Sequence, residues 1–510
     1  MSQKTSRVIV LLGLILSLLP FLAGLLFQDE HHIYSGLLLN PSDGYSYLAK
    51  MQIGVRGEWI FHLPYTPQEG PGAYLFLFYI LLGHIARILN LQPIFVFHLA
   101  RMIAAAVFIC GLNAFLRSIQ VKWLETTHNY LFAVILFGSG LGWLAGLLGV
   151  FTMDFWVAEA YPFLTLIANP HFPLGSGLLL LFLSRYQQEG GRVHWYDPFL
   201  GAALGIILPF GVVVGVTVSV IYNLLLLIQR QTIQWKLPLV YFLPSGIVLI
   251  YQYAAILSDP LLAEWNNQNQ TPTPSLPMVL ISFAPLILLA LIELIFWVFK
   301  DRDSNLNLTV AWFISGIGLA YFPFALQRRF LLGWLIPVGI LAIIGLGKVV
   351  NYQMPKFRKW FWFILPVSVL TNLFLLLGAW QAFVQNQSPL YLTQSEHIAL
   401  KWMQQEICDK RSVILAPENF GLLIPAHTNC RVVYGHPFET IHAEETLRWL
   451  DLFYNKRIED DLLDQFFEQY PVGYIVWTKS LDTPPAGWSQ KLSLVYENEQ
   501  ILIYQMRRNS

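Results

Sequence analysis

The strongest constraint on this chain is a series of long apolar segments. Of its 510 residues, 55% are hydrophobic and only 12% are charged, whereas soluble globular proteins carry about 25% charged residues. A helix of about 20 apolar residues spans a bilayer. We therefore predict a polytopic α-helical membrane protein with about eleven transmembrane helices, near residues 8–27, 94–117, 129–150, 172–186, 198–213, 214–229, 237–257, 277–299, 308–326, 331–349 and 360–380.

The first apolar run could be mistaken for a secretory signal peptide. Lys4 and Arg7 precede the run Val8 to Phe27. That run has about 20 residues, which exceeds the roughly 7–15 of a signal peptide, and no A-x-A site follows it. We interpret it as an uncleaved first membrane helix with its N-terminus in the cytoplasm.

The run Ala73 to Leu89 decides the topology. If it lies along the membrane surface, the Lys and Arg residues of the connections gather on the cytoplasmic side, as the positive-inside rule requires. The outer loops 151–171 and 257–276 then contain neither Lys nor Arg. If the run crosses the bilayer, these signs invert. We therefore predict a juxtamembrane helix within the outer loop 28–93, and an extracytoplasmic segment after about residue 381.

Residues 381–510 are a different kind of sequence, with lower hydropathy and more charge. Short strand-like runs alternate with helical patterns, which predicts a small extracytoplasmic α/β domain after a transmembrane domain over residues 1–380. Strands are expected at 412–416, 431–434, 474–478 and 501–504, and helices at 439–454 and 459–470. Cys408 and Cys430 form a disulfide if this domain faces an oxidising compartment, or else remain two thiols.

The first outer loop carries an acidic residue soon after the first membrane helix. Asp43 stands at the predicted start of a short helix, in the segment Asn40-Pro-Ser-Asp43-Gly-Tyr-Ser-Tyr47. A carboxylate at the membrane surface can accept a proton from a substrate hydroxyl group. The alternative is structural, because an Asp before a helix satisfies free backbone N–H groups.

Other polar residues of the outer side are weaker candidates. Asp154, Glu159 and His171 can orient an acceptor or bind a divalent metal, but their spacing matches no metal motif and each fits an ordinary loop. His98 and Arg101 lie near the outer end of a predicted helix. They can face the same cavity as Asp43 and Tyr47, or only the membrane interface.

Adjacent arginines stand between two apolar segments, in Gln327-Arg328-Arg329-Phe330. Arginine binds phosphate through two parallel N–H donors, so a lipid-linked phosphate suits this position. The alternative is that these side chains reach the lipid headgroups. Because the pair breaks the positive-inside pattern, we favour ligand binding.

Four further features limit the interpretation. Glu293 lies within an apolar helix and is expected to have a partner. The segment from Tyr434 through His436 to Glu439 is predicted as a strand-to-helix turn that can bind a ligand or simply begin a helix. No Walker A, G-x-S-x-G or H-E-x-x-H motif is present, so ATP-driven transport and zinc or serine hydrolysis lack support. The 31 basic and 31 acidic residues likewise give no support to a nucleic-acid partner.

The order of these parts resembles the C-type glycosyltransferase superfamily (GT-C), in its branch of protein O-mannosyltransferases and lipid A aminoarabinose transferases. Those families carry an acidic residue soon after the first membrane helix, then Tyr, Met, Gly and Trp. The matching residues are Asp43, Tyr47, Met51, Gly57 and Trp59, and the family's Pro-containing juxtamembrane helix matches Gly70-Pro71-Gly72-Ala73-Tyr74. The family's Asp-Glu pair is Asp43-Gly44 here, a departure that concerns the substrate more than the fold.

The resemblance implies a cell-envelope glycosyltransferase of the bacterial plasma membrane. It would transfer a hexosyl or pentosyl group, with inversion, from a polyprenyl-phosphate donor to a hydroxyl of a lipid or glycan acceptor on the extracytoplasmic face. It assigns Asp43 as the base or acceptor-orienting carboxylate, and Gln327, Arg328 and Arg329 to the donor phosphate. A divalent cation, Mg²⁺ or Mn²⁺, is an optional cofactor. The alternatives are a flippase or transporter of lipid-linked glycans, which needs no base, and a non-catalytic membrane assembly protein.

Overall fold

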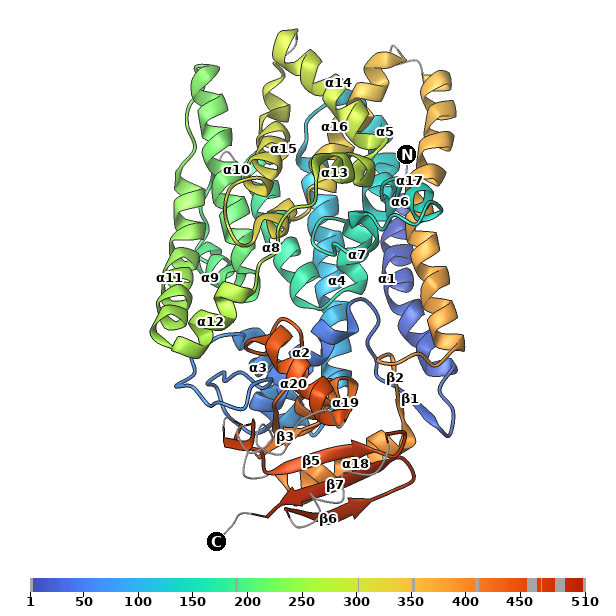
Figure 1. Ribbon diagram of the computed structural model, residues 1–510. Coiled ribbons are helices and arrows are strands. Elements are labelled where there is room, and N and C mark those ends of the chain that lie inside the picture. Colours follow the sequence, from blue (N-terminus) through green and yellow to red (C-terminus); the bar gives the residue numbers. More distant parts are fainter. Residues whose placement is uncertain are drawn as a thin grey trace. The chain divides into compact units, whose positions relative to one another are not determined.

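The computed structural model of the chain divides into two compact units (Figure 1). It describes residues 3–188, 191–300, 302–350, 354–408, 412–455, 466–468, 470–481 and 491–507. The bundle unit comprises Met1–Pro20, His98–Ile250 and Gln270–Gln381, and the sheet unit comprises Phe21–Phe97, Tyr251–Asn269 and Ala382–Ser510. The sheet unit thus unites three segments that are far apart in the sequence.

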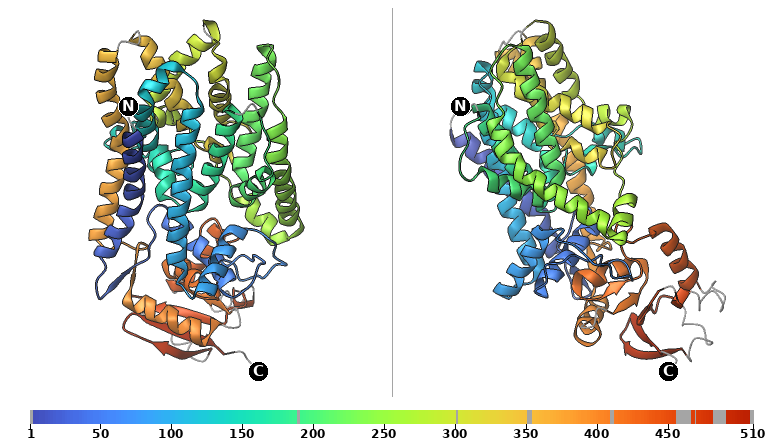
Figure 2. Two further views of the ribbon diagram at one scale, coloured as in Figure 1. Left: turned by 180° about the vertical axis from the view of Figure 1, so that it is seen from behind. Right: turned by 90° about the vertical axis from the view of Figure 1, so that its left-hand side faces the viewer.

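The bundle unit is built from apolar helices that run side by side (Figures 1 and 2). Its main helices are α1 (Gln3–Leu26), α4 (Pro93–Ser118), α5 (Lys122–Phe137), α8 (His171–Gln188), α9 (Asp197–Ile207), α10 (Pro209–Ile228), α11 (Lys236–Ser258), α13 (Leu276–Phe283), α14 (Leu286–Phe299), α15 (Asn307–Ala320), α16 (Leu335–Val349) and α17 (Met354–Val384). Within the described residues, six helices are long and apolar enough to cross a membrane, or seven if α13 and α14, bent by 96° at their junction, form one span.

The predicted count of about eleven spans is not confirmed. The helices at several predicted positions are short, with 11 residues in α9, 14 in α15 and 15 in α16. At 1.5 Å per residue, such helices do not bridge a hydrocarbon core of about 30 Å by themselves. Sequence hydropathy recognises apolar helices correctly but does not distinguish a spanning helix from a shorter buried one.

Two helices show how the bundle divides its apolar residues between lipid and core. Helix α16 is apolar all round, and every residue from Leu335 to Gly347 is buried, as expected for a helix surrounded by others. By contrast, α11 exposes a stripe of large side chains, namely Leu239, Leu243, Ile247 and Ile250. That stripe suits contact with lipid.

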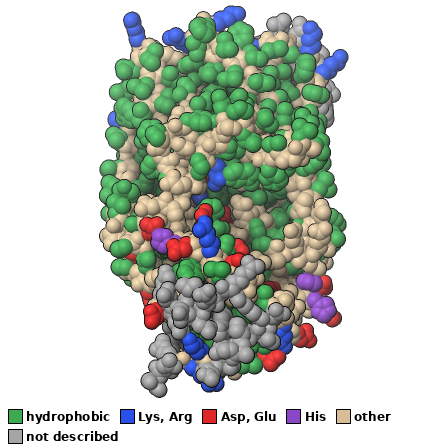
Figure 3. Space-filling model, viewed as in Figure 1, with side chains coloured by type: hydrophobic (Ala, Val, Ile, Leu, Met, Phe, Trp, Pro, Cys, Tyr) green, Lys and Arg blue, Asp and Glu red, His purple; other side chains and the backbone are tan. Residues whose placement is uncertain are grey.

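Charged groups in the bundle unit follow the same logic. Glu293 on α14 is fully buried, and its Oε1 lies 2.8 Å from Lys348 Nζ at the end of α16. This pair confirms that Glu293 has a partner. Figure 3 shows Lys and Arg side chains gathered at one end of the bundle, the end at which α10 joins α11 and α14 joins α15 (Figure 1).

The sheet unit is organised around a five-stranded sheet with the order β4-β3-β5-β7-β6. Its strands are β3 (Val413–Leu415), β4 (Arg431–Val432), β5 (Tyr474–Thr478), β6 (Leu492–Glu497) and β7 (Ile501–Met506). The pairs β3–β4 and β3–β5 are parallel, and β5–β7 and β6–β7 are antiparallel. Helix α18 (Gln394–Glu406) lies against one face of the sheet (Figures 1 and 2).

The four predicted strands are all present, whereas β6 was missed. The helix predicted at 439–454 begins later, as α20 (Ala443–Tyr454), because residues 436–440 form a turn. The helix predicted at 459–470 falls mostly outside the described residues. Two elements without a prediction, α18 and α19 (Glu418–His427), complete this part of the fold.

The first loop folds onto this domain instead of forming a separate layer. Strand β1 (His32–Tyr34) pairs antiparallel with β2 (Tyr391–Thr393). Helix α2 (Pro41–Val55) crosses α3 (Leu77–Leu89) at two glycines, because a Cβ on Gly54 or on Gly83 would approach a carbonyl oxygen of the other helix to 2.0 Å. The 13 residues of α3 are too few to span a bilayer, in keeping with the predicted juxtamembrane helix.

Candidate functional site

Asp43 occupies the first turn of α2, as predicted from the sequence. The helix begins at Pro41 with Asn40 as its N-cap, and no side chain caps it. Asp43 is therefore not an N-cap residue, although a carboxylate in the first turn still interacts favourably with the helix dipole. Its side chain is 44% exposed, which leaves it accessible to a substrate.

His436 faces Asp43 from the turn that follows β4. Its Nε2 lies 3.6 Å from Asp43 Oδ1, and its side chain is only 2% exposed. Its Nδ1 accepts a hydrogen bond of 3.1 Å from the backbone N–H of Phe438. A ring nitrogen that accepts a hydrogen bond carries no proton, so the neutral ring has its proton on Nε2, the nitrogen nearest Asp43.

A buried ion pair connects α2 to the same turn. Lys50 Nζ lies 2.5 Å from Glu439 Oε1 and 2.6 Å from Ser46 Oγ, and the Ser46 hydroxyl also donates to Glu439. Nζ is 4.3 Å from the centre of the Phe76 ring, a favourable cation–π distance. Burial by itself raises the pKa of the Glu439 carboxyl, but opposing effects, of which the charge of Lys50 is the largest, leave this pKa lowered.

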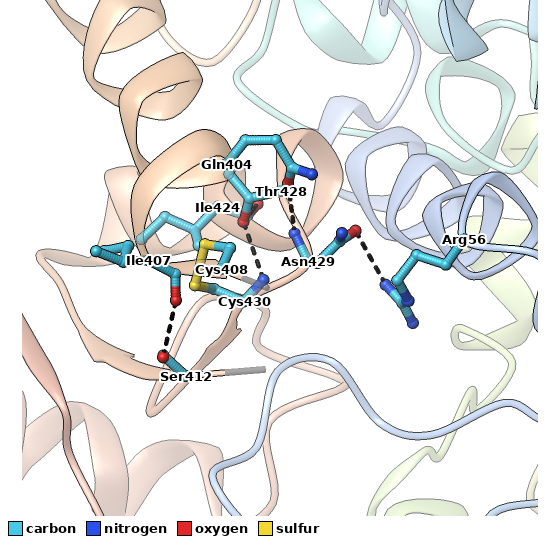
Figure 4. Close-up of a disulfide and its surroundings, with 9 residues drawn as sticks. All are labelled: Arg56, Gln404, Ile407, Cys408, Ser412, Ile424, Thr428, Asn429 and Cys430. Atoms are coloured by element: carbon cyan, nitrogen blue, oxygen red, sulfur yellow. Dashed lines mark hydrogen bonds between the residues drawn. A yellow bond between two sulfur atoms is a disulfide. The ribbon is translucent and has the colours of Figure 1, made fainter. Parts of the chain in front are cut away.

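The start of the turn is fixed by a disulfide and by two glycines. Cys408, after α18, is bonded to Cys430, which directly precedes β4 (Figure 4). This settles the alternative left open by the sequence. Further along, a Cβ on Gly421 would lie 2.2 Å from the Tyr434 carbonyl oxygen, and one on Gly435 would lie 2.5 Å from that of Gly421. Glycine at both positions lets the turn pack directly on α19.

The neighbours of the disulfide also reach α2. Asn429 accepts a hydrogen bond of 3.3 Å from Arg56 at the end of α2, and its backbone N–H donates to Gln404 of α18 at 2.9 Å (Figure 4). The segment that contains His436 therefore contacts α2, the helix of Asp43, at several points.

The predicted arginine site belongs to the bundle unit. Arg328 lies in a short 3₁₀ helix, Gln327–Leu331. Its Nε is 3.6 Å from Glu159 Oε1, and its guanidinium stacks 4.4 Å from the centre of the Trp156 ring. The structure therefore brings together two residues, Glu159 and Arg328, that the sequence proposed separately.

The two neighbours of Arg328 have different surroundings. Gln327 donates to the Phe322 carbonyl at 2.9 Å and accepts from the Thr273 backbone N–H at 3.3 Å, so its amide holds the loop in place. Arg329 lies over the Phe210 ring at 5.7 Å. Arg328 and Arg329 are both only partly exposed.

Asp154 and His171 are buried and do not adjoin a metal site in the described part of the chain. Asp154 is fully buried and accepts hydrogen bonds from Thr152 at 2.6 Å and from the Gly140 and Gly142 backbone at 3.0 Å. Burial raises the pKa of Asp154, and these hydrogen bonds partly offset the effect. His171 is buried against Phe172. Among the described residues, no three or more His, Cys, Asp or Glu side chains lie close enough together to hold a metal ion.

The remaining cavity candidates make structural contacts. Arg101 is fully buried and donates to the backbone carbonyls of Ser17 at 2.8 Å and Leu166 at 3.3 Å, and its Nε lies 3.4 Å from His98 Nδ1. Arg101 therefore braces three segments of the bundle unit. Tyr47, in the sheet unit, stacks on Tyr79 of α3 at 4.3 Å.

Sequence reasoning identified Asp43 and the turn around His436 but did not connect them. One signal was available: Asp43, Ser46 and Lys50 are spaced for one face of a helix, and a lysine on a largely apolar helix face needs an acidic partner. The sequence could not name that partner, because Glu439 is 389 positions from Lys50.

Comparisons with known proteins give the fold but no close relative. No protein-family model matches the chain, and no curated protein matches it. Among solved structures, the arabinofuranosyltransferase AftD from mycobacteria aligns with a TM-score of 0.57 and 14% identity over 100% of this chain and 40% of its own length. The apo oligosaccharyltransferase of Archaeoglobus fulgidus aligns with a TM-score of 0.54 and 12% identity over 94% of this chain and 70% of its own.

A third structure matches in length as well as in fold. ArnT from Cupriavidus metallidurans, bound to undecaprenyl phosphate, aligns with a TM-score of 0.50 and 12% identity over 99% of this chain and 98% of its own. All three structural neighbours are GT-C glycosyltransferases, which confirms the resemblance predicted from the sequence. The chain has the fold of the GT-C membrane glycosyltransferases.

Proposed function

We propose that this chain is a membrane glycosyltransferase that transfers a hexosyl or pentosyl group from a polyprenyl-phosphate donor to a hydroxyl of a lipid or glycan acceptor, with inversion. The observation that carries the proposal is the Asp43 carboxylate, partly exposed at the first turn of α2 and faced by His436. The GT-C fold gives that carboxylate its functional context, since an acid in this position is otherwise only a helix start.

In the proposed reaction, Asp43 accepts the proton of the acceptor hydroxyl as its oxygen bonds to the anomeric carbon. The bond from that carbon to the lipid phosphate breaks, and the phosphate leaves with the electron pair. A carboxylate within hydrogen-bond reach of the hydroxyl can act in this way. Attack opposite the leaving group inverts the anomeric centre.

We assign the donor phosphate to Arg328, with Arg329 and Gln327 beside it. Arg328 is supported by its position over Trp156 and beside Glu159, and by the two parallel N–H donors with which a guanidinium binds phosphate. Preorganised positive charge stabilises a leaving phosphate. Asp43 and Arg328 belong to different units, and each assignment rests on the surroundings of that residue within its own unit.

Two structural neighbours support a lipid phosphate as the ligand class. ArnT was solved with undecaprenyl phosphate, and the Archaeoglobus oligosaccharyltransferase AglB with an inhibitory peptide and dolichol-phosphate. That oligosaccharyltransferase was also solved with Zn and sulfate. In this chain His436 lies beside Asp43, and a histidine is not one of the oxygen ligands that Mg²⁺ and Mn²⁺ prefer.

The proposal places the reaction on the extracytoplasmic face of a bacterial plasma membrane. The Lys and Arg residues at one end of the bundle favour that end as cytoplasmic. A membrane-impermeant maleimide added to intact cells should label a cysteine introduced at Ser42, whereas a cysteine introduced at Arg230 should react only after the cells are permeabilised. Labelling of position 42 from the cytoplasmic side would exclude the proposed site.

The central test is Asp43→Asn in proteoliposomes supplied with a panel of polyprenyl-phosphate hexoses and pentoses and a glycolipid acceptor. Asn keeps the size of the side chain but cannot accept the proton, so transfer should fall by roughly 100- to 10,000-fold. The matched control is Glu444→Gln, an exposed acid of the same unit, which should transfer normally. Undiminished transfer by Asp43→Asn contradicts the assignment, and binding of undecaprenyl phosphate without any transfer by the wild type would favour a flippase.

A further inference from the structure

The turn at residues 434–440 supplies a second polar group beside Asp43, far from it in the sequence. We propose that His436 is a positioning residue for Asp43, so that the C-terminal segment of the sheet unit completes the candidate active site. This inference rests on the proposed function and adds to it a residue that orients the base.

The geometry of His436 points to Asp43 as its partner. Nε2 is buried and, among the described residues, has no hydrogen-bond partner, while Asp43 Oδ1 lies 3.6 Å away. Nδ1 is occupied by the Phe438 N–H, which places the proton of the neutral ring on Nε2. A donor on that nitrogen can hold Oδ1 of Asp43 and leave Oδ2 to accept the proton of the acceptor hydroxyl.

The turn is built to hold the ring in this place. The Thr440 hydroxyl accepts from the backbone N–H groups of Gly435 and His436, both at 3.3 Å. Glu439 is fixed to Lys50 of α2 at 2.5 Å. Since α2 also carries Asp43, the Lys50–Glu439 pair sets the position of His436 relative to Asp43.

The groups that face His436 come from α2, from its own turn and from the first loop. Asp43 faces it from α2, Glu439 lies on its own turn with its charge paired by Lys50, and the Tyr65 ring of the first loop lies at 5.7 Å. Protonation of Nδ1 would place two N–H donors against each other at Phe438. The turn therefore favours the ring with its single proton on Nε2.

Two substitutions separate orientation of Asp43 from support of the turn. His436→Asn places an oxygen where Nδ1 was, so it keeps an acceptor for the Phe438 N–H but removes the donor near Asp43. His436→Gln places an N–H donor near the position of Nε2. We expect His436→Asn to lower kcat by roughly 10- to 100-fold with KM within about twofold, and His436→Gln to stay within a few-fold of the wild type.

Three outcomes would overturn the proposal. His436→Asn with wild-type kcat would show that the donor is not needed. Equal losses in both variants together with a lowered melting temperature would show a purely structural role. Rescue by Asn and not by Gln would place the function on Nδ1.

A second measurement does not depend on catalysis, so failure of this inference is distinguishable from failure of the proposed function. In ¹⁵N-histidine NMR of the full chain in nanodiscs, the signals assigned by loss in His436→Gln should report a neutral ring protonated on Nε2. Asp43→Asn should shift the Nε2 signal, whereas Glu444→Gln should not. An unchanged Nε2 signal in Asp43→Asn rejects the contact even if sugar transfer is confirmed.

Discussion

Two ion pairs, one in each unit, differ in how firmly they hold their cation. Lys50 in the sheet unit is 1% exposed and lies 2.5 Å from Glu439, with Ser46 completing the contact. Arg328 in the bundle unit is 19% exposed and approaches Glu159 only to 3.6 Å while stacking on Trp156. The first pair is closed and holds two segments together. The second is longer, and its cation remains partly exposed.

The largest expected effect tests the closed pair. Glu439→Gln leaves the buried Lys50 ammonium without its compensating charge, which costs about 3–5 kcal/mol of stability. Thermal and denaturant unfolding of the purified protein should show this loss. The double variant Lys50→Met with Glu439→Met removes both charges and should recover most of the stability, and the exposed Glu445→Gln serves as control. A stable Glu439→Gln protein would contradict the structural role given to this pair.

The next effect tests the partly exposed cation, Arg328. Arg328→Gln removes charge-assisted hydrogen bonds worth about 1.5–3 kcal/mol, so the affinity for undecaprenyl phosphate should fall roughly 10- to 100-fold. Native mass spectrometry or a lipid competition assay measures this affinity. Arg302→Gln, an exposed cation elsewhere in the bundle unit, is the matched control. Equal binding by both variants would remove Arg328 from the donor site.

The smallest effect tests whether the sheet unit buries other titratable side chains as fully as it buries Lys50. Burial lowers the pKa of His427 on α19 to about 4, with a contribution from His397. The unfolded chain takes up a proton there near pH 6.5 but the folded chain does not, so stability falls as the pH drops from about 6.5 to about 4. The loss at pH 5 is about 2 kcal/mol.

A comparison of unfolding at pH 7 and pH 5 measures this dependence. His427→Phe should flatten it, whereas His31→Gln, at an exposed position, should leave it unchanged. An unchanged loss of stability between pH 7 and pH 5 in His427→Phe would show that the buried ring is not the titrating group.

Much of the fold could be predicted from local patterns. Apolar runs predicted the helices of the bundle, including the first helix from the run Val8 to Phe27. Short strand-like runs predicted β3, β4, β5 and β7. The span count was not confirmed because apolarity is shared by lipid-facing helices such as α11 and by buried ones such as α16. Only packing against neighbours distinguishes the two.

The sequence by itself determined that this chain has helices apolar enough to cross a membrane, that a sheet domain follows, and that Asp43 lies in the first turn of a helix, because each property depends on neighbouring residues. Only the tertiary structure decided that His436 faces Asp43, that Glu439 neutralises Lys50, and that Glu159 approaches Arg328. Such contacts depend on which distant segments share a unit. A charged residue in an apolar segment predicts that an oppositely charged partner exists, but only the fold determines which residue that partner is.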